Sequence, residues 1–175
     1  MKKFYVLPII LCLLVSCQDT ETLAELEELK AKTALEEQNK ALIEKYIEAW
    51  NTKDMQVFDE ILDPQFKIFV PSNSSSPLSL EQHKAWIQGI FQDFPDIHYH
   101  IQDLVAEGDK VSLRWDCHAT IPGNTPDEPP SDKQILGSAI EIYRIVDGKI
   151  VEERSEMDGL GWNIQMGYTL VMKDE

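Results

Sequence analysis

The stretch that decides the fold runs from residue 147 to residue 167 and reads DGKIVEERSEMDGLGWNIQMG. Asp147-Gly148 is typical of a two-residue β-hairpin turn, because a type I′ turn needs positive φ at both central positions and these residues tolerate it. We therefore expect two long strands to meet here, ILGSAIEIYRIV at 135–146 and its partner at 149–158. Gly159 ends the second strand, and a short helix is expected over residues 160–166.

Charged side chains alternate along this second strand. Its period of two predicts one face with Glu152, Arg154, Glu156 and Asp158, and another with Val151, Glu153, Ser155 and Met157. The first set either faces water or forms a polar pocket, in which Arg154 keeps one carboxylate ionised and another is free for proton transfer. Asp158 stands where strand gives way to helix, so its carboxylate can be directed into a cavity.

The composition indicates one globular domain of moderate size. The chain has 175 residues, of which 43% are hydrophobic and 27% charged. Its formal net charge of -15 repels phosphate backbones, so nucleic acid is not an expected partner. Cys117 has no predicted disulfide partner, and we expect it to be a buried small apolar residue.

The N-terminus has the form of an export signal. It reads MKKFYVLPIILCLLVSC, and its apolar run at 4–15 is too short to cross a bilayer as a helix. Residues 14–17, LVSC, resemble the bacterial lipobox, which implies a signal peptide at 1–16 and a lipidated Cys17 in the cell envelope, with the outer membrane as the expected site. The alternative is an ordinary signal peptide that is cut nearby, with Cys17 incidental.

The order of the remaining elements predicts an α+β fold. Residues 17–37 are Glu-rich and free of Gly and Pro, so we expect a helical stalk. The next element is an amphipathic helix that runs to Trp50. It is followed by a short helix at 54–62 capped by Asn51-Thr52, a strand at 65–70, and a helix that begins after the capping box of Ser79 and Gln82. Then come two strands at 97–107 and 110–120, a rim loop at 121–132 and the hairpin. Residues 168–175 form a tail. Leading helices followed by a strand meander favour α+β over a parallel sheet.

Three segments together resemble a known family. They are NKALIEKYIEAWNTKD at 39–54, LEQHKAWIQGIFQDFPDIHYHIQDLVAEGDKVSLRWD at 80–116 and PPSDKQILGSAIEIYRIVDGKIVEERSEMDGLGWNIQMG at 129–167. In order and spacing they are similar to the SnoaL-like polyketide cyclases, or ester cyclases, of the nuclear-transport-factor-two-like superfamily. The resemblance covers residues 38–167 and implies a cone-shaped, curved, mixed or antiparallel sheet wrapped over three N-terminal helices, with a ligand pocket inside.

The resemblance also implies candidate site residues. The family's general acid/base, an Asp at the end of the last strand, matches Asp158, with Glu141 and Arg154 as further candidates. Residues expected to line the ligand pocket are Tyr46, Trp50, His83, Trp86, Trp115 and Tyr143, with core packing as the alternative for His83, Trp86 and Trp115. No metal or organic cofactor is expected, and a homodimer through the outer sheet face is a further expectation.

Two classes of function are compatible with these residues. One is an enzyme in which Asp158 performs acid–base chemistry on a small hydrophobic carbonyl compound, as a cyclase or isomerase, or in which Glu141, Arg154 and Asp158 hydrolyse an epoxide. The other is an envelope lipoprotein whose cone binds a small apolar ligand or docks a partner without turnover. The sequence alone leaves both open.

Overall fold

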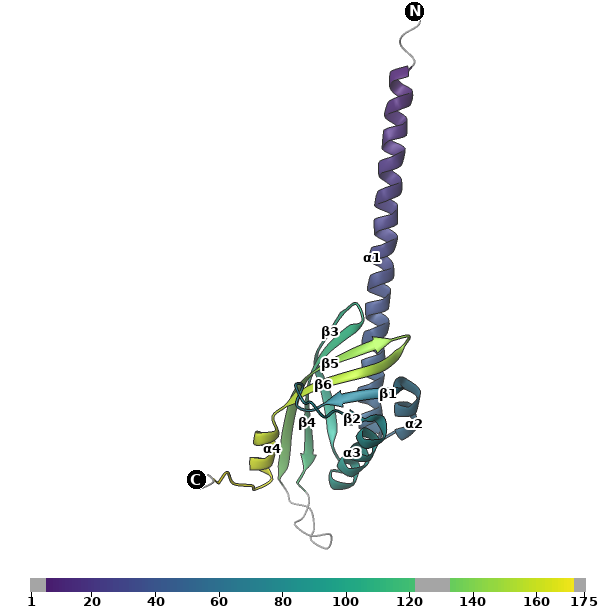
Figure 1. Ribbon diagram of the computed structural model, residues 1–175. Helices are drawn as coiled ribbons and strands as arrows, with labels where there is room; N and C mark the ends of the chain where they lie inside the picture. The colour runs from purple at the N-terminus through teal and green to yellow at the C-terminus, as the bar shows by residue number, and fades with distance from the viewer. Residues whose placement is uncertain (1–5, 122–132, 172–175) are drawn as a thin grey trace, which may run out of the picture.

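The computed structural model describes residues 6–121 and 133–171, with side chains from residue 21 onward. Its first element, α1, is a helix of 47 residues over Val6–Thr52. The stalk expected at 17–37 and the first helix of the domain are therefore one continuous helix, which projects from the domain in Figure 1. Cys17 lies outside the residues whose side chains are described. Of the helices that the structure describes, none has the length and apolarity to cross a membrane.

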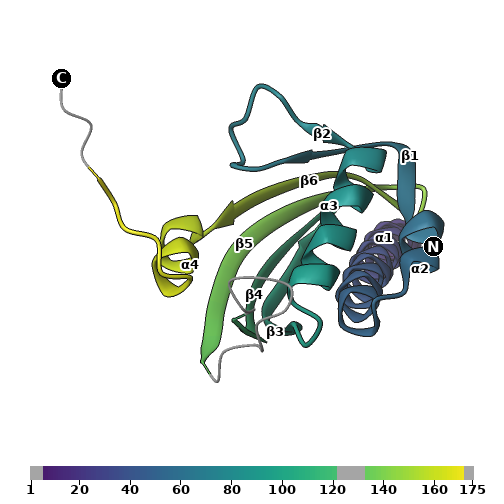
Figure 2. The same cartoon turned by 90° about the horizontal axis from the view of Figure 1, so that it is seen from below.

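The remaining elements form a curved mixed sheet with helices on its concave side. In chain order they are α2 (Met55–Ile61), β1 (Leu62–Phe69), β2 (Leu78–Ser79), α3 (Leu80–Asp93), β3 (His98–Glu107), β4 (Lys110–Thr120), β5 (Gln134–Val146), β6 (Lys149–Met157) and α4 (Gly159–Gln165). The strand order is β2-β1-β6-β5-β4-β3, with β1 parallel to β6 and every other pair antiparallel. Figure 2 shows the sheet bending around α1 and α3. The predicted α+β class and curved sheet are confirmed.

The domain half of α1 is held against the edge strand β3 by side chains that bond to its backbone. Asn51 accepts a hydrogen bond from Tyr99 N at 2.8 Å and donates one to Tyr99 O at 3.0 Å. Near the other end of β3, Asn39 donates to Gly108 O and Glu36 accepts from Gly108 N. These contacts occupy backbone groups that an edge strand otherwise leaves unpaired.

The short helices begin where side-chain caps are available. Asp54 caps α2 by accepting a hydrogen bond from Gln56 N, so the cap lies two residues after the expected Asn51-Thr52. α1 continues through Asn51 and ends at Thr52, and the next residue, Lys53, has a φ of 58°. Ser79 and Gln82 form the predicted capping box at the start of α3.

The β5–β6 hairpin turns as predicted but then departs from regular pairing. Asp147 and Gly148 have φ values of 50° and 72°, and Val146 pairs with Lys149 across the turn. Ile145 pairs with Ile150, yet Arg144 pairs with Glu152, so Val151 is left over as a β-bulge. The bulge reverses the alternation beyond it. Glu153 and Ser155 consequently face the core, and Arg154 does not.

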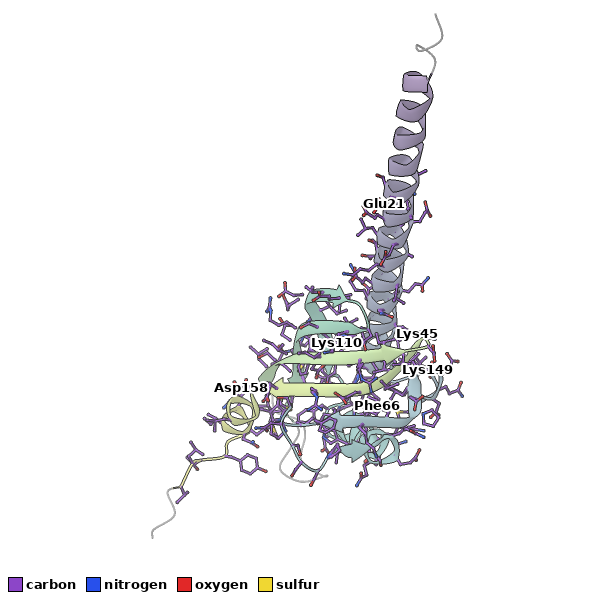
Figure 3. All side chains as sticks on the ribbon, turned by 45° about the horizontal axis from the view of Figure 1, so that its top comes forward. Glu21, Lys45, Phe66, Lys110, Lys149 and Asp158 are labelled. Carbon is purple, nitrogen blue, oxygen red and sulfur yellow. The ribbon has the colours of Figure 1, made fainter. Side chains whose placement is uncertain are left out.

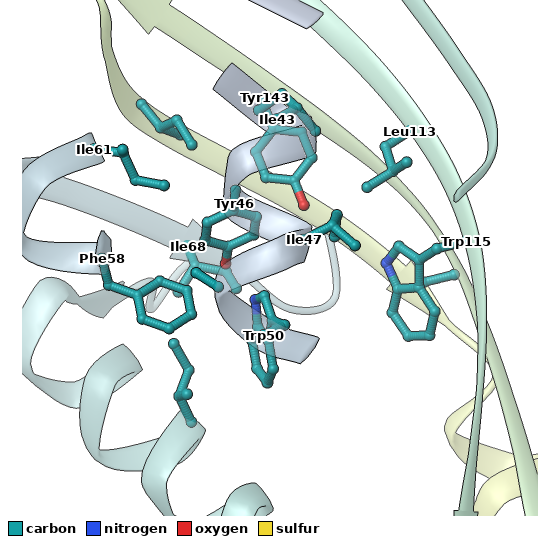
Figure 4. Packing of buried hydrophobic residues seen from close by; sticks show 14 of the residues in the cluster. Ile43, Tyr46, Ile47, Trp50, Phe58, Ile61, Ile68, Leu113, Trp115 and Tyr143 are labelled. Carbon is teal, nitrogen blue, oxygen red and sulfur yellow. The ribbon is translucent and has the colours of Figure 1, made fainter. Parts of the chain in front are cut away.

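Apolar side chains from α1, α2, α3 and the concave face of the sheet form one core. The inward residues of β4 are the predicted set, Val111, Leu113, Trp115, Cys117 and Ala119, and all are buried. In Figure 4 the rings of Tyr46 and Trp50 extend from α1 on the side of Phe58, and both make edge contacts with that ring. Tyr46 makes edge contacts with Phe58 and Tyr143 at centroid distances of 5.5 and 5.6 Å.

The C-terminal helix α4 docks on the end of β5 through a glycine. Gly137 has no side chain, and a Cβ built on it would come within 2.9 Å of both Cys117 Sγ and Trp162 Cζ3. Gln165 adds hydrogen bonds to both Leu136 N and Leu136 O. Close packing at Gly137 therefore determines where α4 lies.

We expect Gly137→Ala to destabilise the protein by about 1–3 kcal/mol, because the added methyl group overpacks this contact. Gly89→Ala is the matched control. Gly89 lies within α3, a Cβ added there would meet no neighbouring atom within 4 Å, and the substitution should gain about 0.5–1 kcal/mol from helix propensity. Urea unfolding of the purified proteins, followed by tryptophan fluorescence, measures both. A Gly137→Ala protein as stable as wild type would contradict this account of α4 docking.

Candidate functional site

A cavity of about 280 Å³ lies between α1, α3 and the concave face of the sheet, and α4 borders it. Its wall is mainly aromatic and aliphatic. The rings and apolar side chains that line it are Tyr46, Ile47, Trp50, Ile68, Val70, Trp86, Ile90, Ile97, Tyr99, Trp115, Met157 and Trp162. Trp86 and Met157 are each 38% exposed, which puts them where the cavity meets solvent. Such a lining suits a small, flat, apolar molecule.

Two carboxyl groups, Glu141 of β5 and Glu153 of β6, line this apolar cavity. Their residues are only 6% and 3% exposed. Glu141 pairs with Ser155 and Tyr143 pairs with Glu153 across the hairpin, so the two acids are diagonal neighbours on the inward face. The fold therefore brings two ionisable groups together in a poorly hydrated place.

Glu141 is the better hydrogen-bonded of the two acids. Tyr143 Oη donates to its Oε2 in a short contact, and Ser155 Oγ donates to its Oε1 at 3.0 Å. Burial raises the pKa of Glu141, while hydrogen bonds from Tyr143, Trp115 and Ser155 act in the opposite direction. These donors favour the ionised form.

Glu153 has fewer groups that stabilise a negative charge. Tyr46 Oη donates to its Oε2 at 3.0 Å. Burial, and then the charge of Glu141, raise the pKa of Glu153 well above its usual range, and the hydrogen bond from Tyr46 only partly offsets them. Because the two acids share one site but have such different surroundings, we expect them to differ in protonation. Glu141 should ionise first and Glu153 should retain its proton.

His83 lies directly behind Tyr46 and does not line the cavity. Its Nε2 is 2.9 Å from Tyr46 Oη, and the residue is fully buried. The rings of Phe66 and Trp86 are within 5.3 and 5.7 Å of the imidazole centroid. Burial lowers the pKa of His83 to about 4, so the ring is neutral at pH 7.

The structure divides the residues that the sequence singled out. Tyr46, Trp50, Trp86, Trp115 and Glu141 line the cavity as expected. His83 and Tyr143 are buried beside it and reach it only through the groups to which they bond, Tyr46 and Glu141.

Two of the expected catalytic residues, Asp158 and Arg154, are not among the lining residues. Asp158 is exposed and caps α4, accepting a hydrogen bond from Gly161 N at 2.8 Å, and Figure 3 shows it at the end of β6 beside that helix. The guanidinium of Arg154 lies 4.0 Å from the ring centroid of Phe69, is paired with Glu152, and donates to Ser72 O. The bulge at Val151 explains both corrections, because it turns this set of residues away from the cavity.

Glu153 is the site residue that sequence reasoning missed. The strand's period of two assigns it to the face opposite the charged set, where its neighbours Ser155 and Met157 are also lining residues. One signal was present in the sequence: beyond Lys149 at the turn, Glu153 is the only charged residue on a face otherwise made of Val151, Ser155 and Met157. A single charge on an apolar strand face indicates a buried site.

The cavity also contains a thiol, and no metal site is recognisable near it. Cys117 lines the cavity, and burial raises the pKa of its thiol to about 11, so it is not a thiolate at neutral pH. In the described part of the chain, no group of three or more His, Cys, Asp or Glu side chains is arranged to hold a metal ion.

Comparison with known proteins identifies the fold of this site. The family model described as SnoaL-like polyketide cyclase matches residues 40–166. Among solved structures, AclR from Streptomyces galilaeus is 24% identical with a TM-score of 0.66, covering 75% of this chain and 97% of its own. IdmH from Streptomyces antibioticus is 24% identical with a TM-score of 0.65, covering 74% and 99%. TsrD from Streptomyces laurentii is 28% identical with a TM-score of 0.62, covering 74% and 95%. No curated protein matches the sequence.

The raised pKa of Glu153 predicts how its replacement changes stability with pH. A carboxyl whose folded-state pKa lies above the ordinary value of 4.5 contributes stability at low pH that is lost as pH rises toward the folded-state pKa. Glu153→Gln should therefore gain in unfolding free energy relative to wild type between pH 5 and 8, by at most about 1.4 kcal/mol per pH unit. Urea unfolding across this range measures the difference.

Glu44→Gln is the control for this prediction, because Glu44 is exposed on α1. It should follow the wild-type pH profile. Titration of His83 also changes the unfolding free energy with pH, but it does so in both wild type and Glu153→Gln, so it cancels when the two proteins are compared. A difference that stays constant from pH 5 to 8 would show that Glu153 is not an acid whose pKa is raised by burial.

Proposed function

The chain belongs to the SnoaL-like polyketide cyclase family, and from this premise we propose that its cavity binds a small, flat, mainly apolar carbonyl compound and transfers a proton on it. The observation that carries the proposal is the pair of buried acids, Glu141 and Glu153, at one apolar cavity with unequal hydrogen bonding. Acid–base catalysis needs one ionised and one protonated group within reach of the same molecule.

The proposed step uses each acid once. The Glu141 carboxylate takes a proton from the carbon next to the carbonyl group, which breaks the C–H bond and leaves its electron pair in an enolate. Protonated Glu153 donates its proton to the enolate oxygen, so the ligand leaves this step as the enol while Glu141 is protonated and Glu153 ionised. The apolar wall makes this favourable, because charge that develops on oxygen is stabilised more strongly by a nearby donor in a dry site.

A second candidate function is binding of the same class of ligand without turnover. One observation favours it: Tyr143, Ser155 and Tyr46 already donate hydrogen bonds to the two acids. Acids engaged in this way also serve as polar anchors that orient a ligand. The two candidates differ in whether a proton leaves the bound molecule.

Exchange of the α-hydrogens of 2-tetralone in D₂O, followed by proton NMR, tests proton transfer without knowledge of the natural ligand. We expect the wild-type protein to accelerate exchange. Glu141→Gln and Glu153→Gln should each lose at least about 100-fold, the usual contribution of a general acid or base. Asp158→Asn is the matched control and tests the rival acid indicated by the family resemblance; it should retain the wild-type rate.

Each other outcome has a clear meaning. Loss of exchange in Asp158→Asn together with full activity in Glu153→Gln would return the role to Asp158 and overturn our assignment. Line broadening of 2-tetralone by the wild-type protein, without any accelerated exchange, would favour the binding function.

We also propose that the chain is a lipoprotein of a bacterial envelope, anchored through Cys17. The support is the sequence LVSC at 14–17 after a short apolar run, together with a long helix that separates this end from the domain. An acyl chain then provides membrane attachment. The outer membrane is the expected site of this anchor.

Metabolic labelling in a bacterial host with an alkyne-bearing fatty acid tests this anchor. The wild-type chain should take up label and fractionate with membranes, whereas Cys17→Ser should lose both properties. Cys12→Ser is the matched control, because Cys12 lies within the apolar run, and it should label normally. Equal labelling of the Cys17→Ser and wild-type chains would rule out lipidation at Cys17.

A further inference from the structure

The buried polar groups behind the cavity form a chain that ends in an unpartnered atom. His83 Nε2 is 2.9 Å from Tyr46 Oη, which is 3.0 Å from Glu153 Oε2. The other ring nitrogen, His83 Nδ1, is buried and has no hydrogen-bond partner among the described residues. Each unpartnered buried polar atom needs a physical explanation, since it costs stability.

The number of hydrogens in this chain allows two directions. If His83 carries its hydrogen on Nε2, the ring donates to Tyr46 Oη, and the Tyr46 hydroxyl is free to donate to Glu153. If the hydrogen is on Nδ1, the Tyr46 hydroxyl must donate to Nε2 instead. In that case Tyr46 Oη can only accept from Glu153, which must then place its own proton on Oε2, and the buried Nδ1–H is left without an acceptor.

The first direction leaves fewer groups unsatisfied. It leaves only the lone pair of Nδ1 without a partner, whereas the second leaves a buried N–H unpaired and also directs the proton of Glu153 toward Tyr46. Orphaned buried N–H groups are rare in proteins for this reason. Hydrogen bonds that run in one direction also polarise one another, so a ring that donates to Tyr46 makes its hydroxyl a better donor to Glu153.

We propose that His83 is a positioning residue that acts through Tyr46, fixing the tyrosine hydroxyl as a donor to Glu153 and thereby stabilising the carboxylate that remains when Glu153 gives up its proton. This inference rests on the proposed function for its consequence in catalysis, but the direction of the hydrogen-bond chain stands without it. The unpartnered Nδ1 is the structural cost of that direction.

Other titratable groups also act on Glu153 and affect its titration. Those that face it or share its cavity come from four further elements: Tyr46 of α1, Tyr99 of β3, Cys117 of β4, and Glu141 and Tyr143 of β5. Of these, Tyr46 is the one that donates a hydrogen bond to Glu153. A test of His83 must therefore compare variants in which the remaining groups are unchanged.

The tautomer of His83 in the wild-type protein is the direct test and needs no substitution. Long-range ¹H–¹⁵N NMR at pH 7 should show Nε2 carrying the hydrogen and Nδ1 bare. A spectrum with the hydrogen on Nδ1 would overturn the proposal, because Tyr46 then donates to the ring. This result does not depend on whether the protein has catalytic activity.

Carboxyl ¹³C NMR titration of Glu153 provides the second test. His83→Leu, similar in size and unable to bond to Tyr46, should raise the pKa of Glu153, and Tyr46→Phe should raise it further, since it removes the donor itself. His83→Gln, which keeps a side-chain N–H, should restore much of the wild-type value. An unchanged pKa in folded His83→Leu would overturn the proposal; if that variant does not fold, the tautomer measurement decides alone. If these pKa changes are observed but neither the wild-type protein nor any variant accelerates 2-tetralone exchange, the proposed reaction is rejected and the positioning role of His83 stands.

Discussion

One unpaired residue, Val151, determines which side chains of the last strand face the cavity. Regular pairing from the Asp147-Gly148 turn would place Glu152 opposite Tyr143, and the period of two would then turn Arg154 and Asp158 inward. The observed pairing is Tyr143 with Glu153, because the bulge adds one residue to β6. Every later position on the strand is therefore reversed, and the acid that β6 contributes to the cavity is Glu153.

The same bulge organises the outer side of the strand. Arg154 lies over Phe69 and donates to Ser72 O, and Glu156 accepts hydrogen bonds from Ser72 N and Oγ. These contacts tie the segment between β1 and β2 to β6. The sequence allowed the charged set to be either a solvated face or a polar pocket. In the structure Arg154 and Glu156 of this set belong to a network outside the cavity, and the inward set lines the cavity.

A feature of this fold could be predicted from the sequence when it depends on residues that are close together in the chain. Local signals were sufficient for the Asp147-Gly148 turn, the capping box at Ser79 and the alternation of β4, because each depends on residues close together in the chain. The place of Glu141 in the site was expected from the family resemblance. The bulge has no local signature in IVEERSEM, since it lies in the pairing with β5, and a regular strand gave no reason to place Glu153 in the cavity. Asp158 was expected there from its place at the end of the strand and from the family resemblance. Lipidation at Cys17 and a homodimer remain predictions.

The cavity holds features that the fold does not require. Buried acids with raised pKa values reduce stability at neutral pH, and apolar replacements of buried charged groups are often neutral or stabilising. A cavity of about 280 Å³ beside them forfeits packing contacts, and His83 Nδ1 adds a buried polar atom with no partner among the described residues. A core of Ile, Leu and Phe on the same backbone would avoid all three costs. The proposed function accounts for their occurrence together, because His83 and Glu153 are joined through Tyr46 in one hydrogen-bonded chain beside the cavity that would bind the ligand.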